Sequence, residues 1–382
     1  MNLDKKMIKN SIPQIRFKGF DVVWVENRIT DIVKVSAGGD VDKEKLKENG
    51  KYPVIANALT NKGIVGYYDD YKVKAPAVTV TGRGDVGYAV ARHENFTPVV
   101  RLLTLQSDSI DVDYLENQIN SMKILNESTG VPQLTAPQLG NYKVYHPEID
   151  EQSAIGSLFR TLDDLLASYK DNLANYQSLK ATMLSKMFPK SGQTVPEIRL
   201  DGFEGEWEEK EFSKLVKRVT QSCDSDSLPK VEFEDIISGQ GRLNKDISSK
   251  FDNRKGIHFK PGYTLYGKLR PYLNNWLLPK FEGVALGDFW VFDPNGNDSN
   301  FIYYLIQSNR YQKVANDTSG TKMPRSDWKS VSSTIFAIPQ TVAEQQAIGA
   351  YFSNLDNLIN SNQEKISQLE TLKKKLLQDM FI

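Results

Sequence analysis

The chain is built from two copies of one plan. Residues 12–24 (IPQIRFKGFDVVW) and 195–207 (VPEIRLDGFEGEW) share six of 13 positions. A second match joins residues 151–188 to residues 344–381, where 15 of 38 positions are identical. Between these matches the two halves have little in common. Such an internal repeat constrains the fold more than composition does. Each half therefore has a similar opening, a dissimilar body and a similar closing segment.

The two closing segments are predicted to be long helices. Apolar residues recur there at alternating intervals of four and three, which is typical of a coiled coil. Lys180 and Lys373 interrupt the two stripes at the same place, and we expect each stripe to shift there by one position, to Leu179 and Leu372. The predicted coiled-coil contacts are Ile155, Phe159, Leu162, Leu166, Tyr169, Leu173, Ile348, Phe352, Leu355, Ile359, Ile366 and Leu369.

At 1.5 Å per residue each helix would be roughly 55 Å long. The simplest packing is an antiparallel pair related by a pseudo-twofold axis. Two unrelated amphipathic helices on separate globular cores remain an alternative.

The bodies are predicted to mix helices and strands. Residues 77–81, 98–105, 262–266 and 289–292 have the β-branched and aromatic content of strands, and residues 300–314 have a helical pattern. The expected fold class is α+β, with two mixed α/β bodies in a pseudo-twofold arrangement separated by two antiparallel coiled-coil helices. The expected division is a first body at 1–150, a helix at 151–190, a second body at 191–339 and a helix at 340–382.

Composition excludes several classes of protein. With 48 Lys and Arg against 48 Asp and Glu, the chain is not a polybasic binder held by bulk charge. One cysteine, Cys223, excludes an internal disulfide and a cysteine-based zinc site, and three histidines are too few to suggest a metal cage. The sequence shows no signal peptide and no apolar run near the ~20 residues that span a bilayer, so we expect a cytoplasmic protein that has no membrane partner.

No catalytic motif stands out. The sequence has no phosphate-binding P-loop, no H-E-x-x-H zinc motif and no nucleophile elbow. Gly82–Gly87 matches G-x-G-x-x-G, but a strand-like run that contains Pro98 follows it where a dinucleotide site needs a helix. A β-hairpin turn is the better interpretation. An enzyme that binds a cofactor at this turn stays open as an alternative.

Charge is balanced overall but uneven locally. Residues 239–280 hold nine basic residues against two acidic ones, with aromatics between them. Lys and Arg neutralise phosphates, and Arg, Asn and Gln read base edges, so this composition favours a DNA-binding surface. A solvated face without a ligand is the alternative.

The order of body, helix, body and helix resembles that of the specificity (S) subunit of type I restriction–modification systems, over essentially the whole chain. The two openings carry the resemblance together with the junctions before each helix, HPEIDEQ at 146–152 and IPQTVAEQ at 338–345. The family pattern is a proline followed shortly by Glu-Gln-x-x-Ile. The first junction departs slightly, because His146 stands where an apolar residue is usual.

This resemblance implies a non-catalytic subunit that reads a split site on double-stranded DNA, one half-site per body. Two modification subunits would bind it and methylate adenine at N6 with S-adenosylmethionine. Two restriction subunits would join them for cleavage that needs ATP and Mg²⁺. The chain itself would hold no metal and no cofactor. The alternative is a coiled-coil scaffold with two protein-binding heads.

The resemblance and the turn residues together indicate candidate DNA contacts in both bodies. Those in the first body are Asn57, Thr60, Lys62, Thr81, Arg83, Thr129 and Gly130. Those in the second are Lys268, Arg270, Tyr272, Ser319, Gly320, Lys322 and Arg325.

Overall fold

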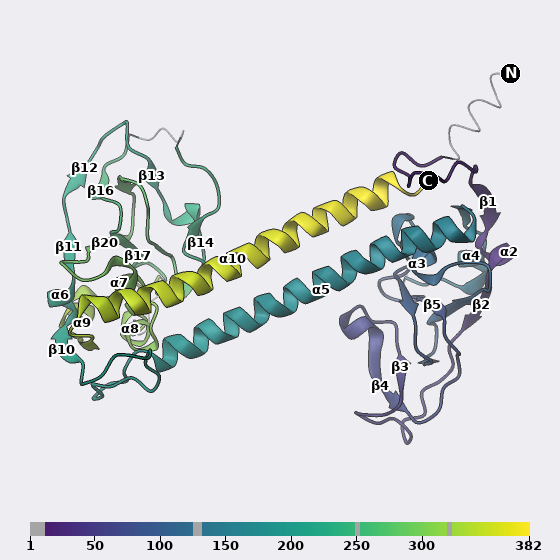
Figure 1. Cartoon of the computed structure of the whole chain (residues 1–382), viewed down its shortest axis with the longest axis horizontal. Coiled ribbons are helices and arrows are strands. Elements are labelled where there is room, and N and C mark those ends of the chain that lie inside the picture. The colour runs from purple at the N-terminus through teal and green to yellow at the C-terminus, as the bar shows by residue number, and fades with distance from the viewer. Residues whose placement is uncertain (1–11, 125–131, 249–252, 319–322) are drawn as a thin grey trace. The chain divides into compact units, whose positions relative to one another are not determined.

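The protein was studied as a computed structural model, which describes residues 12–124, 132–248, 253–318 and 323–382. The chain divides into two compact units, and both long helices contribute to each of them. Unit 1 comprises Met1–Lys170 and Glu364–Ile382, and unit 2 comprises Asp171–Gln363. Figure 1 labels the helices and strands and colours the chain from the N-terminus to the C-terminus.

Unit 1 is built mainly on antiparallel β-structure, and the pair β3–β7 is parallel. Its largest sheet has the order β2-β8-β5-β6, a smaller one has β4-β3-β7, and β1 pairs with β9. The helix α3 (Val112–Ser121) packs near the strands β5 and β6. The strands are β1 (Val25–Arg28), β2 (Lys34–Ala37), β3 (Tyr52–Ile55), β4 (Ile64–Tyr68), β5 (Ala77–Val80), β6 (Ala89–Arg92), β7 (Thr97–Pro98), β8 (Leu103–Gln106) and β9 (Lys143–His146). The short helices are α2 (Ile29–Ile32), η1 (Thr60–Gly63) and α4 (Ala136–Gly140).

Unit 2 repeats parts of this plan. Its two four-stranded sheets have the orders β11-β20-β17-β18 and β12-β16-β19-β13, and β10 pairs with β21 as β1 pairs with β9. The strands are β10 (Glu208–Glu211), β11 (Lys217–Val219), β12 (Ser222–Cys223), β13 (Lys230–Val231), β14 (Ile236–Ile237), β15 (Arg242–Leu243), β16 (Gly256–Phe259), β17 (Thr264–Gly267), β18 (Trp276–Leu277), β19 (Gly283–Ala285), β20 (Phe289–Asp293) and β21 (Ile335–Ile338). The short helices are α6 (Phe212–Leu215), η2 (Phe233–Asp235), η3 (Pro271–Leu273), α7 (Ser299–Leu305), α8 (Asn309–Ala315) and α9 (Trp328–Ser333).

The two long helices are α5 (Ile149–Lys186) and α10 (Val342–Asp379), and they pack side by side and antiparallel (Figure 1). Ion pairs join them in unit 1, between Lys170 and Glu370, and in unit 2, between Lys180 and Asp356. All twelve predicted contact positions are buried or half-buried. The predicted shift at the lysines is wrong, because Leu179 and Leu372 are exposed and the lysines stay in the stripe.

Each long helix also completes the core of a body. In unit 1 the α5 residues Ile155 and Phe159 share a core with Tyr114 of α3, and Phe381, just beyond α10, packs against both aromatic rings. Unit 2 repeats this arrangement, with Phe188 against Phe301 and Phe352.

The Glu-Gln junction explains why these contacts recur. Gln152 accepts a hydrogen bond of 3.0 Å from the backbone N–H of Asp111, and Asp111 caps α3. Gln345 makes the same bond, also of 3.0 Å, to Asp298, which caps α7. One turn further along each long helix stands Gly156 or Gly349, where a Cβ would lie 2.5 or 2.7 Å from the capping carboxylate. Only glycine lets the long helix approach the cap so closely.

Two sequence-based predictions of elements need correction. Residues 98–105 are not one strand, because Arg101 adopts a left-handed φ of 68° and the chain passes from β7 to β8 in a different sheet. Residues 300–314 are not one helix, because Ser308 is extended and caps a new helix, α8. The predicted β-hairpin at Gly82–Gly87 is confirmed, since it joins the antiparallel strands β5 and β6.

Candidate nucleic-acid interface

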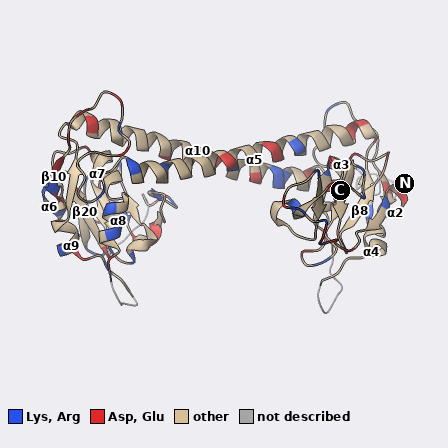
Figure 2. Ribbon diagram, turned by 90° about the horizontal axis from the view of Figure 1, so that it is seen from below, with Lys and Arg blue, Asp and Glu red and all other residues tan. Residues whose placement is uncertain are grey.

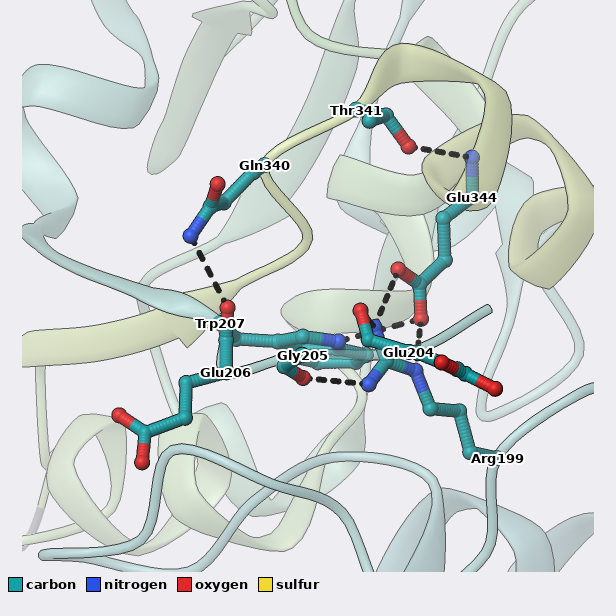
Figure 3. Close-up of polar contacts among 8 residues, drawn as sticks. All are labelled: Arg199, Glu204, Gly205, Glu206, Trp207, Gln340, Thr341 and Glu344. Atoms are coloured by element: carbon teal, nitrogen blue, oxygen red, sulfur yellow. Dashed lines mark hydrogen bonds and ion pairs between the residues drawn. The ribbon is translucent and has the colours of Figure 1, made fainter. Parts of the chain in front are cut away.

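An ion pair joins the opening of each half to its Glu-Gln junction. In unit 2 the guanidinium of Arg199 donates two hydrogen bonds of 2.8 Å to the carboxylate of Glu344, and the indole N–H of Trp207 donates a third of 3.1 Å (Figure 3). The glutamate side chain is only 4% exposed. The bonds to Glu344 hold the pKa of Arg199 above its ordinary value.

Unit 1 has the same pair. Arg16 donates to Glu151 at 2.6 and 2.7 Å, and Glu151 is 2% exposed on its side chain. The indole of Trp24 is buried there, but its N–H has no hydrogen-bond partner among the described residues. The repeated residues of the openings and junctions thus form one structural contact, which fixes where each long helix begins.

In unit 2 two of the predicted DNA-binding segments lie together. The loop after β17 runs from Lys268 to Tyr272, and Leu269 forms a β-bridge with Arg325. The N–H of Arg270 donates to the carbonyl of Pro324 at 2.7 Å, which holds Arg270 in a left-handed conformation with φ of 48°. Arg270 and Tyr272 are both exposed, and Tyr272 is 57% exposed.

Asp288 is a counter-ion for this cluster. Its carboxylate accepts hydrogen bonds from Arg325 at 3.0 and 3.3 Å and lies 3.7 Å from the ammonium of Lys268. The hydrogen bond to Asp288 raises the pKa of Arg325, so this guanidinium stays charged. An ion pair this exposed contributes little to stability, so a phosphate can compete for the cations.

The basic stretch 239–280 is less basic in three dimensions than its sequence suggests. Carboxylates from outside the stretch form ion pairs with part of it. Figure 2 shows basic and acidic positions on both bodies and on the long helices. These ion pairs are Lys245 with Asp235, Arg254 with Glu232, Lys255 with Asp224 and Lys268 with Asp288. The count of seven excess positive charges therefore overstates the local charge.

The aromatics of this stretch are mostly core residues. Phe259 and Tyr266 are fully buried and Trp276 is 6% exposed, so they offer no platform for stacking bases. Burial raises the pKa of Tyr266 to about 12. Among the described aromatics of this stretch, Tyr272 is the exposed one.

In unit 1 some predicted contacts have structural roles. The side-chain amide of Asn57 donates to the carbonyl of Val100 at 3.0 Å and accepts from the N–H of Gly82 at 2.8 Å. Thr81 is 5% exposed, and its hydroxyl donates to the carbonyl of Asp85 and accepts from the N–H of Tyr88. These two side chains shape the hairpin turn that carries Arg83.

Arg83 is exposed and forms a β-bridge with Gln133. Thr60 and Lys62 lie in the exposed turn η1, where the carbonyl of Lys62 accepts a hydrogen bond of 2.7 Å from Arg92. Arg92 is itself 8% exposed, and burial lowers its pKa to about 10.

The two units agree in one respect. In each, the loop after the strand β5 or β17 forms a bridge through Gln133 or Arg325. Each of these two residues follows a Ser/Thr-Gly loop that was predicted to contact DNA, at Thr129-Gly130 or Ser319-Gly320. Five predicted contacts lie outside the described residues, namely Thr129, Gly130, Ser319, Gly320 and Lys322.

Sequence reasoning missed two residues at this interface. Asp288 is 20 residues from Lys268 in the chain, and no pattern marks it as the shared counter-ion. Arg101 is exposed, and its carbonyl lies 2.2 Å from where a Cβ on Gly82 would stand, so it neighbours the Arg83 turn. Its left-handed φ has no signal in the sequence, since arginine favours no such conformation.

Among the described residues, no cluster of three or more His, Cys, Asp and Glu side chains could hold a metal ion. The same part of the chain contains no helix that is both long and apolar enough to cross a membrane.

Known proteins that this chain resembles in sequence are named as type I specificity subunits. A Mycoplasma pneumoniae protein named as a type I specificity subunit is 27% identical over 143 residues, or 36% of this chain and 39% of that protein. The specificity subunit of the Escherichia coli type I restriction enzyme EcoDI is 19% identical over 402 aligned positions, covering 91% of this chain and 86% of that one. The matched stretches span half or less of the M. pneumoniae relatives.

The fold also matches that of a known protein. The crystal structure of the type I restriction–modification S subunit from M. genitalium superposes with a TM-score of 0.71 at 14% identity, over 97% of this chain and 99% of that one. The family model described as the type I restriction modification DNA specificity domain matches residues 22–176 and again 214–371, which is well over half of the chain. This protein therefore belongs to the family of type I restriction–modification specificity subunits.

Proposed function

We propose that this protein reads a bipartite DNA target and positions two adenine-N6 modification subunits on it, as the specificity subunit of a type I complex. The observation that carries the proposal is the recurrence of one interface in both units. A loop that bears an exposed arginine, Arg83 or Arg270, is fixed against the segment after the Ser/Thr-Gly loop. Each body, 1–150 and 191–339, is then a target recognition domain for one half-site.

The chemistry of this interface suits DNA. The guanidiniums of Arg83 and Arg270 can form paired hydrogen bonds to a guanine edge, while lysines contact phosphates and set the register. The low similarity between the bodies supports two different half-sites. The interface of unit 2 keeps its cations paired with Asp288 until a phosphate replaces that carboxylate.

The long helices support a fixed spacing. Each has 38 residues, or roughly 57 Å at 1.5 Å per residue. Half-sites one turn of DNA apart, about 34–36 Å, fit within that length.

In the proposed complex this chain supplies recognition and its partners supply the chemistry. The modification subunits would bind S-adenosylmethionine and flip the target adenine out of the duplex, while this chain holds the duplex in register. Two restriction subunits would add ATP- and Mg²⁺-dependent cleavage. All of this would take place in the cytoplasm.

The test is to express the chain with its modification subunit and sequence the methylated adenines of the host DNA. We expect methylation on a split sequence with one fixed spacer. Affinity for DNA that carries this sequence should also fall linearly, in logarithms, as salt rises. A protein-binding scaffold without a DNA role gives neither result, and the partial neutralisation of residues 239–280 makes it the alternative to exclude.

A further inference from the structure

Two half-buried lysines, Lys180 and Lys373, lie in helix faces that are otherwise mostly apolar. The side chain of Lys180 is 12% exposed and that of Lys373 is 26% exposed, whereas the adjacent leucines, Leu179 and Leu372, are 37% and 44% exposed. Burying an ammonium costs free energy, and turning the helix by one residue would replace it with leucine. The lysines therefore contribute something other than apolar packing.

In unit 2 the half-buried lysine belongs to a network that joins three elements. The ammonium of Lys180 on α5 lies 2.7 Å from Oδ1 of Asp356 on α10 and 5.4 Å from the ring centre of Tyr304 on α7. The hydroxyl of Tyr304 donates to Oδ2 of Asp356 at 2.8 Å. Both oxygens of the carboxylate are thus engaged, and burial raises the pKa of Tyr304.

Unit 1 contains the reciprocal pair. Lys373 on α10 lies 2.5 Å from Oδ1 of Asp163 on α5. Glu116 of α3 interacts electrostatically with both members of this pair. Burial raises its pKa most, Asp163 raises it further and Lys373 lowers it.

The two pairs are copies of each other in the repeat. In each long helix the lysine follows its aspartate by 17 residues, from Asp163 to Lys180 and from Asp356 to Lys373. Because both helices have the same interval, one antiparallel register satisfies both ion pairs. A slip of seven residues would move each lysine about 10 Å from its aspartate.

Apolar stripes alone do not distinguish such slipped registers well, since a heptad shift places apolar residues against apolar residues again. Polar groups at single core positions select a register at a cost in stability. We propose that the pairs Lys180–Asp356 and Lys373–Asp163 are positioning residues that select the register of α5 and α10. On the proposed function, they thereby fix the spacer between half-sites.

The test uses four proteins of identical composition and net charge. The wild type is compared with an α5 reversal (Asp163→Lys with Lys180→Asp), an α10 reversal (Asp356→Lys with Lys373→Asp) and the combination of all four substitutions. Each single-helix reversal makes both pairs like-charged in the native register, and the combination restores opposite charges in both.

We expect both single-helix reversals to lower the melting temperature by ~5 °C or more, and the combination to recover most of that loss. The α10 reversal should be the less stable of the two, because it places a third carboxylate beside Asp163 and Glu116. In the complex, the wild type and the combination should methylate one split sequence with one spacer. The single-helix reversals should lose that methylation or change its spacer.

The exposed pair Lys170–Glu370 on the same helices is the matched control, since its side chains are 55% and 52% exposed. The substitution Lys170→Glu, which makes this exposed pair like-charged, should change the melting temperature from that of the wild type by less than about 1 °C. If the two single-helix reversals melt and methylate as the wild type does, the inference is overturned. If the wild type methylates no split sequence, the proposed function fails, and the melting comparison still decides whether the pairs select a register.

An apolar variant separates register from stability. In this variant all four charged residues are replaced by leucine. Tyr304→Phe also removes the hydroxyl that would lose its acceptor. The variant should melt at a temperature no lower than that of the wild type. It should methylate the target with more than one spacer, or with a reduced yield at the wild-type spacer. Full methylation at a single wild-type spacer would show that the apolar stripe and the aromatic contacts of Phe188 and Phe381 suffice to set the register, and would overturn the inference.

Discussion

Arg199 and Glu344 are 145 positions apart in the chain, yet two hydrogen bonds of 2.8 Å join them. The contact brings the repeated opening of unit 2 against the first turn of α10. Arg16 and Glu151 make the same contact in unit 1. The arginine and glutamate that the two halves share are therefore accounted for by an ion pair within each unit.

Glu344→Gln should lower the free energy of unfolding of unit 2 by about 3 kcal/mol, because it leaves a half-buried guanidinium without its carboxylate. Glu151→Gln should cost unit 1 about 1 kcal/mol less, since Trp24 makes no bond to Glu151 for the substitution to break. Urea denaturation measures both. Glu206→Gln, on an exposed position of the same loop, is the control and should have little effect.

Arg83→Ala and Arg270→Ala should each weaken binding to the methylated target by ~1–3 kcal/mol if the guanidinium reads a base. Relaxed sequence preference should appear in one half-site only, a different one for each substitution. Methylated-site sequencing and competition binding measure this effect. Unchanged affinity and preference would assign the arginine a role in the turn alone.

Asp288→Asn should strengthen nonspecific binding to DNA, because it frees Lys268 and Arg325 from their shared counter-ion. The slope of log affinity against log salt should become steeper, by the amount that about one or two additional phosphate contacts would add. A salt titration with unrelated duplex DNA measures the slope. A slope equal to that of the wild type would mean that these cations do not reach the duplex.

Glu116 should make the stability of unit 1 depend on pH. Burial, and next the charge of Asp163, raise its pKa from 4.5 to about 7. The folded state therefore holds this proton more tightly than the unfolded state does. The contribution of protonated Glu116 to the stability of unit 1 is fully present below pH 4.5 and is lost as the pH rises through about 7.

Glu116→Gln should remove this dependence and raise the free energy of unfolding by ~1–3 kcal/mol at pH 8. The gain should shrink as pH falls toward 5. Melting curves from pH 5 to 8 measure it, and a gain that is constant over this range would contradict the raised pKa.

The long helices could be predicted from sequence because their apolar period is local and is repeated. The predicted strand at 98–105 is interrupted at Arg101 by a left-handed turn, and the predicted helix at 300–314 is interrupted at Ser308 by a helix cap. Both features override the local sequence pattern. These features depend on which sheet or helix the next segment joins, and sequence periodicity carries no such information.

The candidate interface was harder to predict because charge is a property of neighbours in space. Counting residues 239–280 missed Asp235, Glu232, Asp224 and Asp288, which come from outside the stretch. Turn composition correctly marked the segments of Arg83 and Arg270 as exposed, but it could not separate them from Thr81, whose hydroxyl closes the hairpin.

The packing of Phe381 against Tyr114 and Phe159 has a consequence for how the chain is made. A ribosome synthesises every residue of unit 2 before it reaches residues 364–382, which complete the core of unit 1. Part of the apolar core of the N-terminal body therefore stays uncovered until the second body has been synthesised. Translation thus supplies the last core residues of the unit that it begins first only after it has made the whole of the other unit.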